Sequence, residues 1–147
     1  TLAEKFLKAT VYLSDLDEKT LNVARKNSTN QIILKSNLLK NYPKDLFFDI
    51  IVANLPYIPT DRINNLPSSV KDFEPHMALD GGPDGATIID ELLSQLPGHL
   101  KPNGLAIVEI DDTHILESFK IPKNFSGVIK KDKFGRNRFL ILHPDIM

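Results

Sequence analysis

The segment Phe47–Ala53, FFDIIVA, constrains the fold more than any other part of the chain. A strand with one face in water alternates apolar and polar residues, whereas this run is apolar at nearly every position. Such a run is typical of an interior strand of a parallel sheet that is buried on both faces. Parallel strands need long crossover connections, which are usually helical. The run therefore predicts an α/β fold.

The first third of the chain repeats the same pattern on a smaller scale. A short amphipathic helix is expected at 1–8, and short buried strands are expected at 10–15 and 31–36. A helix between the two strands begins after Asp17, which is placed to act as its N-cap. The residues expected on the buried side of that helix are Leu21, Val23 and Ala24.

The last third of the chain continues the alternation and ends in two adjacent strands. Gly135 permits the tight turn of an antiparallel hairpin between them, so the parallel sheet is expected to carry an antiparallel edge pair. The expected elements are a helix at 85–96 with Ile88, Ile89, Leu92, Leu93 and Leu96 at helical spacing, a buried strand at 103–110, a short helix at 113–119, and strands at 125–134 and 137–143.

The composition excludes several classes of protein. The 147 residues suffice for one domain with a core, so residues 1–147 are assigned to a single domain. The absence of cysteine rules out disulfides and cysteine metal sites, and we expect no metal site. A net charge of −1 argues against binding nucleic acid through bulk electrostatics. No apolar run approaches the roughly 20 residues of a membrane span, so a cytoplasmic location is expected.

Polar side chains follow three of the expected strands. Ligands of open α/β sheets bind beyond the carboxyl ends of the strands, which are occupied here by Asp15, Asn37 and Asn54. A carboxylate such as Asp15 can accept both hydroxyls of a ribose, but it can equally cap the following helix. Asn37 is also a common turn residue. The residues alone leave both interpretations open.

The segment Asn54–Tyr57, NLPY, combines acceptors with an aromatic face. Pro56 and Pro59 remove backbone donors, Asn54 adds a side-chain oxygen, and Tyr57 adds a flat ring. This arrangement suits an –NH2 group whose two protons need acceptors. The alternative is an ordinary strand exit with Tyr57 as a core aromatic. The long proline-rich stretch 55–84 is the first place to look for a site.

Two motifs at this spacing resemble a known family. NLPY after FDIIVA resembles the NPPY motif of amino-methylating S-adenosylmethionine-dependent methyltransferases. EPHMALDGGPDG, Glu74–Gly85, is similar to the loop that follows in the release factor glutamine methyltransferases. These enzymes methylate the side-chain nitrogen of the glutamine in the Gly-Gly-Gln tip of peptide chain release factors. The closing KKDKFGRNRFLIL resembles the family's terminal hairpin.

The resemblance runs from about Leu2 to the end and implies a Rossmann-like methyltransferase sheet with S-adenosylmethionine as cofactor. By the resemblance, Asp15 holds the cofactor ribose, and Asn37 with Leu38 contacts the adenine, although the family often has aspartate at position 37. The full set of implied cofactor residues is Asp15, Leu16, Asn37, Leu38 and Asn54.

The resemblance also assigns the catalytic segment and the substrate loop. The Asn54 side-chain oxygen and the Leu55 carbonyl each accept one proton of the target amide, while Tyr57 packs on the amide plane. Transfer is then a direct displacement governed by positioning and electrostatics, without a conventional general base. The catalytic residues implied are Asn54, Leu55, Pro56 and Tyr57, and the substrate-loop residues are Glu74, Pro75, Asp80, Gly81 and Gly82.

One departure from the pattern keeps other functions in play. Leu55 stands where the family usually has proline, and NLPY is also the form seen in ribosomal RNA adenine dimethyltransferases. The first alternative is therefore an N6-adenine methyltransferase of RNA or DNA, although the downstream loop favours glutamine in a release factor. The second alternative is a non-catalytic fragment.

The cofactor half of the resemblance is incomplete. The family's first strand and glycine-rich loop are missing from this chain and are expected before Thr1, so we expect a natural protein that is longer at its N-terminus. The chain alone is expected to bind S-adenosylmethionine weakly or not at all and to be inactive. Other polar residues are expected to be structural: Asp111 and Asp112 as a helix cap, and His76, His99, His114 and His143 as surface or loop residues.

Overall fold

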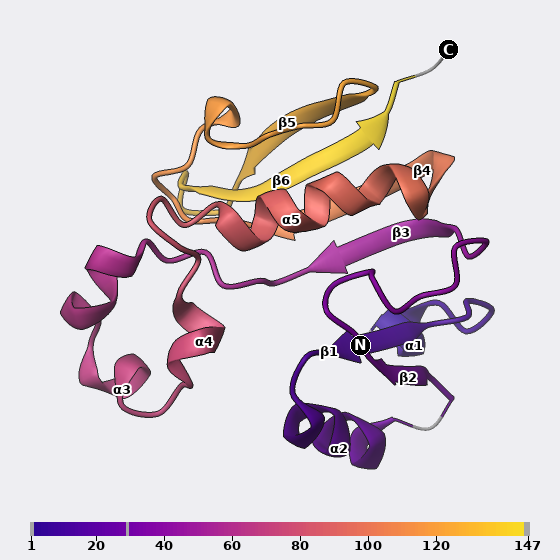
Figure 1. Ribbon diagram of the computed structural model, residues 1–147, viewed down its shortest axis with the longest axis horizontal. Coiled ribbons are helices and arrows are strands. Elements are labelled where there is room, and N and C mark those ends of the chain that lie inside the picture. The colour runs from indigo at the N-terminus through magenta and orange to yellow at the C-terminus, as the bar shows by residue number, and fades with distance from the viewer. Residues whose placement is uncertain (1, 29, 146–147) are drawn as a thin grey trace. The chain divides into compact units, whose positions relative to one another are not determined.

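The computed structural model describes residues 2–28 and 30–145, in two compact units, Thr1–Pro43 and Lys44–Met147. Figure 1 shows the helices and strands of both units. The assignment of the whole chain to one domain stays a prediction. Among the described residues, no helix has the length and apolar composition needed to cross a bilayer.

The first unit is a parallel strand pair with a crossover helix. β1 (Tyr12–Asp15) pairs with β2 (Ile32–Lys35), and α2 (Glu18–Asn27) connects them. Asp17 caps α2 as expected, because its carboxylate accepts the Lys19 N–H at 3.1 Å. The expected strands and helix are therefore confirmed in this unit.

The burial expected in the first unit is only partly correct. Leu21 of α2 is fully buried, but Val23 is 58% exposed, so its assignment to the buried side is wrong. β1 is half-buried rather than buried, because within the described residues β2 is its only strand partner. The expected helix at 1–8 is reduced to α1 (Leu2–Lys5), and Phe6 and Leu7, expected on its apolar side, are exposed.

The second unit is a four-stranded sheet in the order β3–β4–β6–β5. The sheet is parallel between its first two strands and antiparallel across the rest, as the hairpin pattern predicted. α5 (Thr87–Gln95), continued by the 3-10 turn η2 (Leu96–Gly98), lies over the sheet (Figure 1) and buries Ile89, Leu92, Leu93 and Leu96. The strands are β3 (Phe48–Ala53), β4 (Leu100–Glu109), β5 (Phe125–Lys131) and β6 (Asn137–Pro144).

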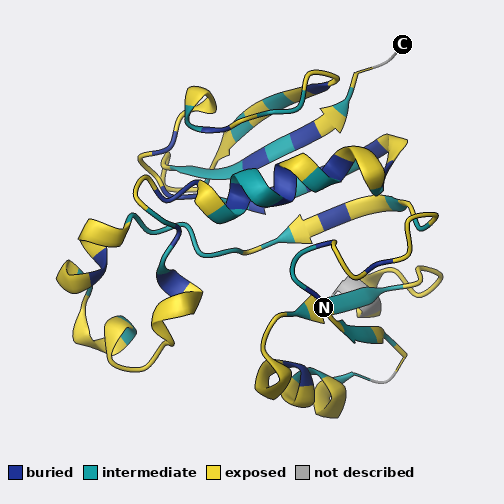
Figure 2. Cartoon of the chain, in the orientation of Figure 1, coloured by how far each residue is buried: buried dark blue, intermediate teal, exposed yellow. Residues whose placement is uncertain are grey.

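β3 differs from the interior strand that its apolar run predicted. It is an edge strand of its sheet, and among the described residues only Ile51 of β3 is buried, while Ile50 and Val52 are 54% and 55% exposed. Figure 2 shows this alternation along the strand. The expectation of burial on both faces is wrong for the described chain, because α5 covers one face and no described strand pairs with the open edge.

The proline-rich stretch after β3 is not a bare loop. It forms η1 (Thr60–Asn65), α3 (Ser68–Lys71) and α4 (His76–Leu79), each beginning directly after a proline. These turns extend beyond the C-terminal end of β3 (Figure 1) and are mostly exposed (Figure 2), with only Ile63 and Leu79 buried. This excursion, residues 60–79, therefore buries few apolar side chains, and the chain returns at Asp80, which bridges to Ile58 just beyond β3.

The end of the chain follows the expected hairpin closely. Gly135 has φ +82° in the β5–β6 turn, and the Asp132 carboxylate accepts the N–H groups of Phe134 and Arg136. The expected helix at 113–119 is reduced to the three-residue 3-10 turn η3 (Leu116–Ser118).

Candidate active site

The acidic residue at the end of β1 supports the helix that follows it, and its role towards a ribose stays a prediction. One carboxylate oxygen of Asp15 accepts the Asp17 N–H at 2.8 Å, so Asp15 does support the start of α2. Its other oxygen has no hydrogen bond among the described residues. Asp15 is half-buried and the neighbouring Leu16 is 49% exposed. A ligand hydroxyl can therefore still be accepted at this strand end.

The turn after β2 is held in a strained conformation. Leu38 has φ +54°, a left-handed conformation that a residue with a Cβ rarely adopts. The buried Ser36 hydroxyl donates to the Leu38 carbonyl at 2.7 Å and accepts the Asn41 N–H at 3.2 Å. Asn37 lies half-buried in this turn, and its N–H donates to the Asn41 side chain. Ser36 thus fixes the pair that the resemblance assigns to adenine.

Asn54 leaves the end of β3 with its side chain free. Ala53 pairs with Val108 of β4, so Asn54 emerges at the carboxyl edge of the parallel pair, level with Glu109. Asn54 is exposed, and neither its side chain nor the Leu55 carbonyl has a hydrogen-bond partner within residues 2–28 and 30–145. Two unused carbonyl-type acceptors therefore lie next to each other in the chain.

Tyr57 is anchored to the neighbouring strand. Its hydroxyl donates to the Glu109 carboxylate at 3.0 Å, and Arg138 lies 3.6 Å from the same carboxylate. Burial, followed by the hydrogen bond to Glu109, raises the pKa of Tyr57 above its ordinary value. The hydroxyl consequently stays protonated and donates to Glu109 over the physiological pH range.

The glycine turn, residues 81–85, packs directly on the backbone of Tyr57. A Cβ placed on Gly81 would lie 2.8 Å from the Tyr57 Cα, and a Cβ on Gly85 would collide with the Tyr57 carbonyl oxygen. Ile58 bridges to Asp80, accepts the Gly81 N–H at 2.9 Å and donates to Leu79 at 3.1 Å. The two motifs that carried the resemblance are therefore in backbone contact.

Asp80 organises the near end of the substrate loop. Its carboxylate accepts the Thr60 hydroxyl at 2.7 Å and the Gly82 N–H at 2.9 Å, and these bonds lower the pKa of Asp80. Glu74 and Pro75, by contrast, are exposed in the excursion, where Pro75 precedes α4. Of the five expected loop residues, Asp80, Gly81 and Gly82 contact the chain between Tyr57 and Thr60. Glu74 and Pro75 do not.

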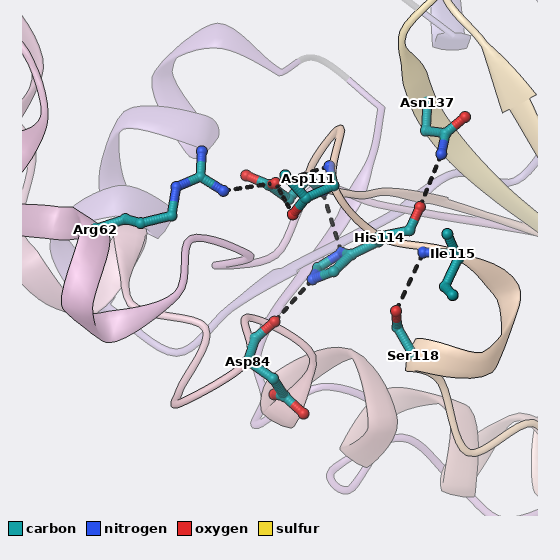
Figure 3. A network of polar contacts seen from close by, with 8 residues as sticks. Arg62, Asp84, Asp111, His114, Ile115, Ser118 and Asn137 are labelled. Carbon is teal, nitrogen blue, oxygen red and sulfur yellow. Dashed lines mark hydrogen bonds and ion pairs between the residues drawn. The ribbon is translucent and has the colours of Figure 1, made fainter.

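A second polar network lies beside the glycine turn (Figure 3). Arg62 of the excursion donates to the buried Asp111 at 2.8 Å, and Thr113 donates to the same carboxylate oxygen through its N–H and hydroxyl. Burial by itself would raise the pKa of Asp111, but these hydrogen bonds and the Arg62 charge lower it. The expectation that Asp111 and Asp112 cap a helix is wrong: η3 begins only at Leu116 with Ile115 at its N-cap, and Asp111 instead holds a turn and pairs with Arg62.

His114 lies in a loop, as one of the two expectations for it had it, but it is buried rather than at the surface. It is 3% exposed, and Figure 3 shows its ring turned towards Asp84. Of the other histidines, His76 and His143 are exposed and His99 is half-buried with Nδ1 at 3.0 Å from the Leu46 carbonyl. In the described part of the chain, no three His, Asp or Glu side chains are grouped to hold a metal ion.

The comparisons with known proteins agree with the two motifs. No family model matches the chain. Proteins named release factor glutamine methyltransferase do match it. The protein from Koribacter versatilis is 33% identical in an alignment of 141 residues that covers 87% of this chain and 50% of that protein. The protein from Caulobacter vibrioides is 40% identical over 102 residues, 65% of this chain and 35% of the relative.

Over most of its length this chain is similar to proteins named release factor glutamine methyltransferase. It spans about half, or less, of the length of the curated relatives it matches. Two solved methyltransferases share its fold. Ribosomal protein L11 methylase from Lactobacillus delbrueckii has a TM-score of 0.64 at 22% identity, covering 99% of this chain and 63% of its own. TrmN from Thermus thermophilus has a TM-score of 0.62 at 18% identity, covering 97% and 39%. The Rossmann-like methyltransferase fold is therefore confirmed.

The residues that position the NLPY segment include several that the sequence did not single out. Glu109 fixes Tyr57 from the end of β4, next to the end of β3 that Asn54 follows. Because this strand was expected at 103–110, the residues considered beyond its end were Asp111 and Asp112 rather than Glu109. His114 and Arg62 had no comparable signal, because their partners are main-chain atoms or residues far away in the sequence.

The Arg62–Asp111 contact predicts how stability responds to acid. The pKa of Asp111 is lower in the folded than in the unfolded state, so its stabilisation is fully present above about pH 4 and is lost as pH falls. We expect Asp111→Asn to lower the free energy of unfolding by about 1–2 kcal/mol at pH 7. The variant should also lose less stability than the parent between pH 5 and pH 3, measured by urea denaturation.

The neighbouring Asp112 is the matched control for this experiment, because it is exposed. Asp112→Asn should change the urea midpoint little at either pH. Equal acid sensitivity in the Asp111→Asn variant and the parent would show that the ion pair contributes nothing to the pH dependence.

Proposed function

We propose that this chain forms part of the catalytic region of an S-adenosylmethionine-dependent methyltransferase that methylates the side-chain amide nitrogen of a glutamine in peptide chain release factors. The observation that carries the proposal is the backbone contact between the NLPY segment and the glycine turn. It is supported by the similarity to the curated relatives and by the name that they carry.

The acceptors at the end of β3 suit a primary amide. An amide –NH2 has two protons, and the unpartnered Asn54 side-chain oxygen and Leu55 carbonyl offer one acceptor for each. The amide nitrogen is a poor nucleophile because its lone pair is delocalised. Hydrogen bonds from both protons to fixed acceptors shift electron density back to nitrogen and hold its orientation.

Tyr57 fits the role of a platform for the amide plane. Its hydroxyl is bound to Glu109 and its backbone is held by Gly81, so ring position is set at both ends. Leucine at position 55 in place of proline leaves the main-chain carbonyl available. The substitution therefore gives up a fixed φ without giving up the acceptor.

Several residues fit parts of the cofactor. The free oxygen of Asp15 suits a ribose hydroxyl, and the strained turn at Leu38, held by Ser36, offers a fixed edge to a base. When bound, S-adenosylmethionine supplies a methyl group made electrophilic by its sulfonium sulfur. The expectation that the chain alone binds this cofactor weakly stays a prediction.

The test is methyl transfer from labelled S-adenosylmethionine with three substrates in parallel: a release factor, ribosomal RNA and DNA. The protein should be expressed from its complete reading frame. We expect label on the release factor, and none on a release factor whose Gly-Gly-Gln glutamine is replaced by alanine. Label on nucleic acid alone would favour the adenine methyltransferase, and no label on any substrate would favour the non-catalytic alternative.

A further inference from the structure

The ring of His114 is buried next to the candidate site, although no step of the proposed chemistry uses it. His114 lies in the turn that follows β4, 3% exposed. Its Nδ1 lies 3.3 Å from the Asp111 N–H, and its Nε2 lies 2.9 Å from the Asp84 carbonyl oxygen (Figure 3). Both partners are main-chain groups, so the contacts do not depend on the side-chain rotamers of Asp111 and Asp84.

These partners fix the protonation of the ring. A backbone N–H can only donate, so Nδ1 of His114 must accept, and a carbonyl can only accept, so Nε2 must donate. Only the neutral tautomer with the proton on Nε2 satisfies both Asp111 and Asp84. The ring thus acts as a fixed strut between the end of β4 and the glycine turn.

Gly85 lies next to both the His114 ring and the Tyr57 backbone. A Cβ placed on Gly85 would lie 3.1 Å from His114 Nε2 and would collide with the Tyr57 carbonyl oxygen. Gly85 has φ +76° and is therefore held in a conformation that glycine adopts at little cost. The three residues are thus packed with no room for a side chain at position 85.

The ring is itself held from several directions. Phe119 packs edge-to-face on it with ring centroids 5.1 Å apart. Asn137 donates to the His114 carbonyl at 2.8 Å, and Arg62 pairs with Asp111, whose N–H meets the ring. These contacts hold the ring in one position, and the ring in turn holds the Asp84 carbonyl to which its Nε2 is bonded.

We propose that His114 is a positioning residue for methyl transfer. Its Nε2–H holds the Asp84 carbonyl, which keeps Gly85 against Tyr57 and so keeps the Leu55 carbonyl and the Tyr57 ring in register with the amide. The role of His114 in methyl transfer rests on the proposed function, whereas its role in holding the glycine turn does not.

Two amide substitutions separate the two contacts of the ring. Glutamine reaches the position of Nε2 and can donate to Asp84, whereas asparagine reaches only the position of Nδ1 and can accept from Asp111. We expect His114→Asn to lower kcat for the release factor at least about tenfold with little change in KM. His114→Gln should retain most of the activity.

A stability-matched control excludes a general effect of unfolding. Leu142 is fully buried in β6, opposite Ala106 and Gly127, and belongs to no part of the site. Leu142→Val should lower the melting temperature by a few degrees and leave kcat within about twofold. Equal kcat in His114→Asn and His114→Gln, or a loss in Leu142→Val as large as that in His114→Asn, would overturn the proposal.

Hydrogen exchange gives a readout that needs no activity. In the turn, Gly85 donates to the Gly82 carbonyl at 3.1 Å and Thr87 donates to the Gly81 carbonyl at 3.0 Å. Both amides should exchange at least about tenfold faster in His114→Asn than in His114→Gln. Unchanged exchange in both variants would refute the strut itself. A parent protein that fails to methylate would instead refute the proposed function.

Discussion

Replacing Asn54 by alanine should lower kcat for glutamine methylation by about 100- to 1,000-fold, because it removes one of two acceptors for the amide protons. A hydrogen bond to the reacting group contributes most in the transition state, where charge on the reacting atoms changes. KM for the release factor should change much less, since the large protein substrate makes other contacts. The measurement is steady-state transfer of labelled methyl groups.

The same substitution should leave the fold intact. The Asn54 side chain is exposed and has no hydrogen-bond partner among the described residues, so Asn54→Ala should melt at the parent temperature. Asn103 is the matched control: it is an exposed asparagine of β4 near the opposite end of that strand. Asn103→Ala should keep full activity. A wild-type rate in Asn54→Ala would remove Asn54 from the proposed mechanism.

Replacing Gly85 by alanine should produce the largest loss of stability of any glycine substitution described here, about 3 kcal/mol in the free energy of unfolding. Alanine at φ +76° costs about 1–2 kcal/mol, and its Cβ would collide with the Tyr57 carbonyl oxygen and crowd His114. Denaturant unfolding should show the loss as a lower midpoint with an unchanged slope.

Two other glycines separate strain from collision. Gly135 has φ +82° but nothing within 4 Å of an added Cβ, so Gly135→Ala should lose only about 1–2 kcal/mol. Gly98 has neither a positive φ nor a nearby atom, so Gly98→Ala should lose nothing. If Gly85→Ala costs no more than Gly135→Ala, the backbone contact between the glycine turn and Tyr57 is looser than its geometry indicates.

The local parts of this fold were predictable because their signals are local. The N-cap at Asp17, the apolar face of α5 and the glycine turn of the β5–β6 hairpin each depend on a few neighbouring residues. All three were correctly predicted. Register and strand order then follow from the parallel pairing of β3 with β4 and the antiparallel hairpin.

The incorrect predictions concern burial, which depends on what covers a residue from elsewhere in the chain. Ile50 and Val52 of β3 are as apolar as Ile51, and only the arrangement of the described elements decides that Ile51 alone is buried. Composition likewise gave no reason to place His114 in the interior. Its burial follows from the Asp84 carbonyl, Asp111 N–H and Phe119 ring, partners that no periodicity reports.

The candidate site residues likewise separate into those with a local sequence signal and those without one. The residues proposed to contact a ligand were singled out by their place after a strand, where Asp15 and Asn54 each keep an oxygen without a hydrogen bond among the described residues. The residues that support them were not, because Ser36, Glu109 and His114 act on main-chain atoms or on a ring 52 residues away in sequence. Sequence motifs thus indicate which residues could contact a ligand, but not which residues hold them in place.

The central claim is that the acceptors after β3 select a glutamine side-chain amide. The most direct measurement is mass spectrometry of a release factor after incubation with S-adenosylmethionine and the protein from its complete reading frame. We expect one added methyl group, located by fragmentation on the side-chain nitrogen of the glutamine in the Gly-Gly-Gln tip, and none with Asn54→Ala. A release factor that remains unmodified while adenines in RNA or DNA gain methyl groups would contradict the claim.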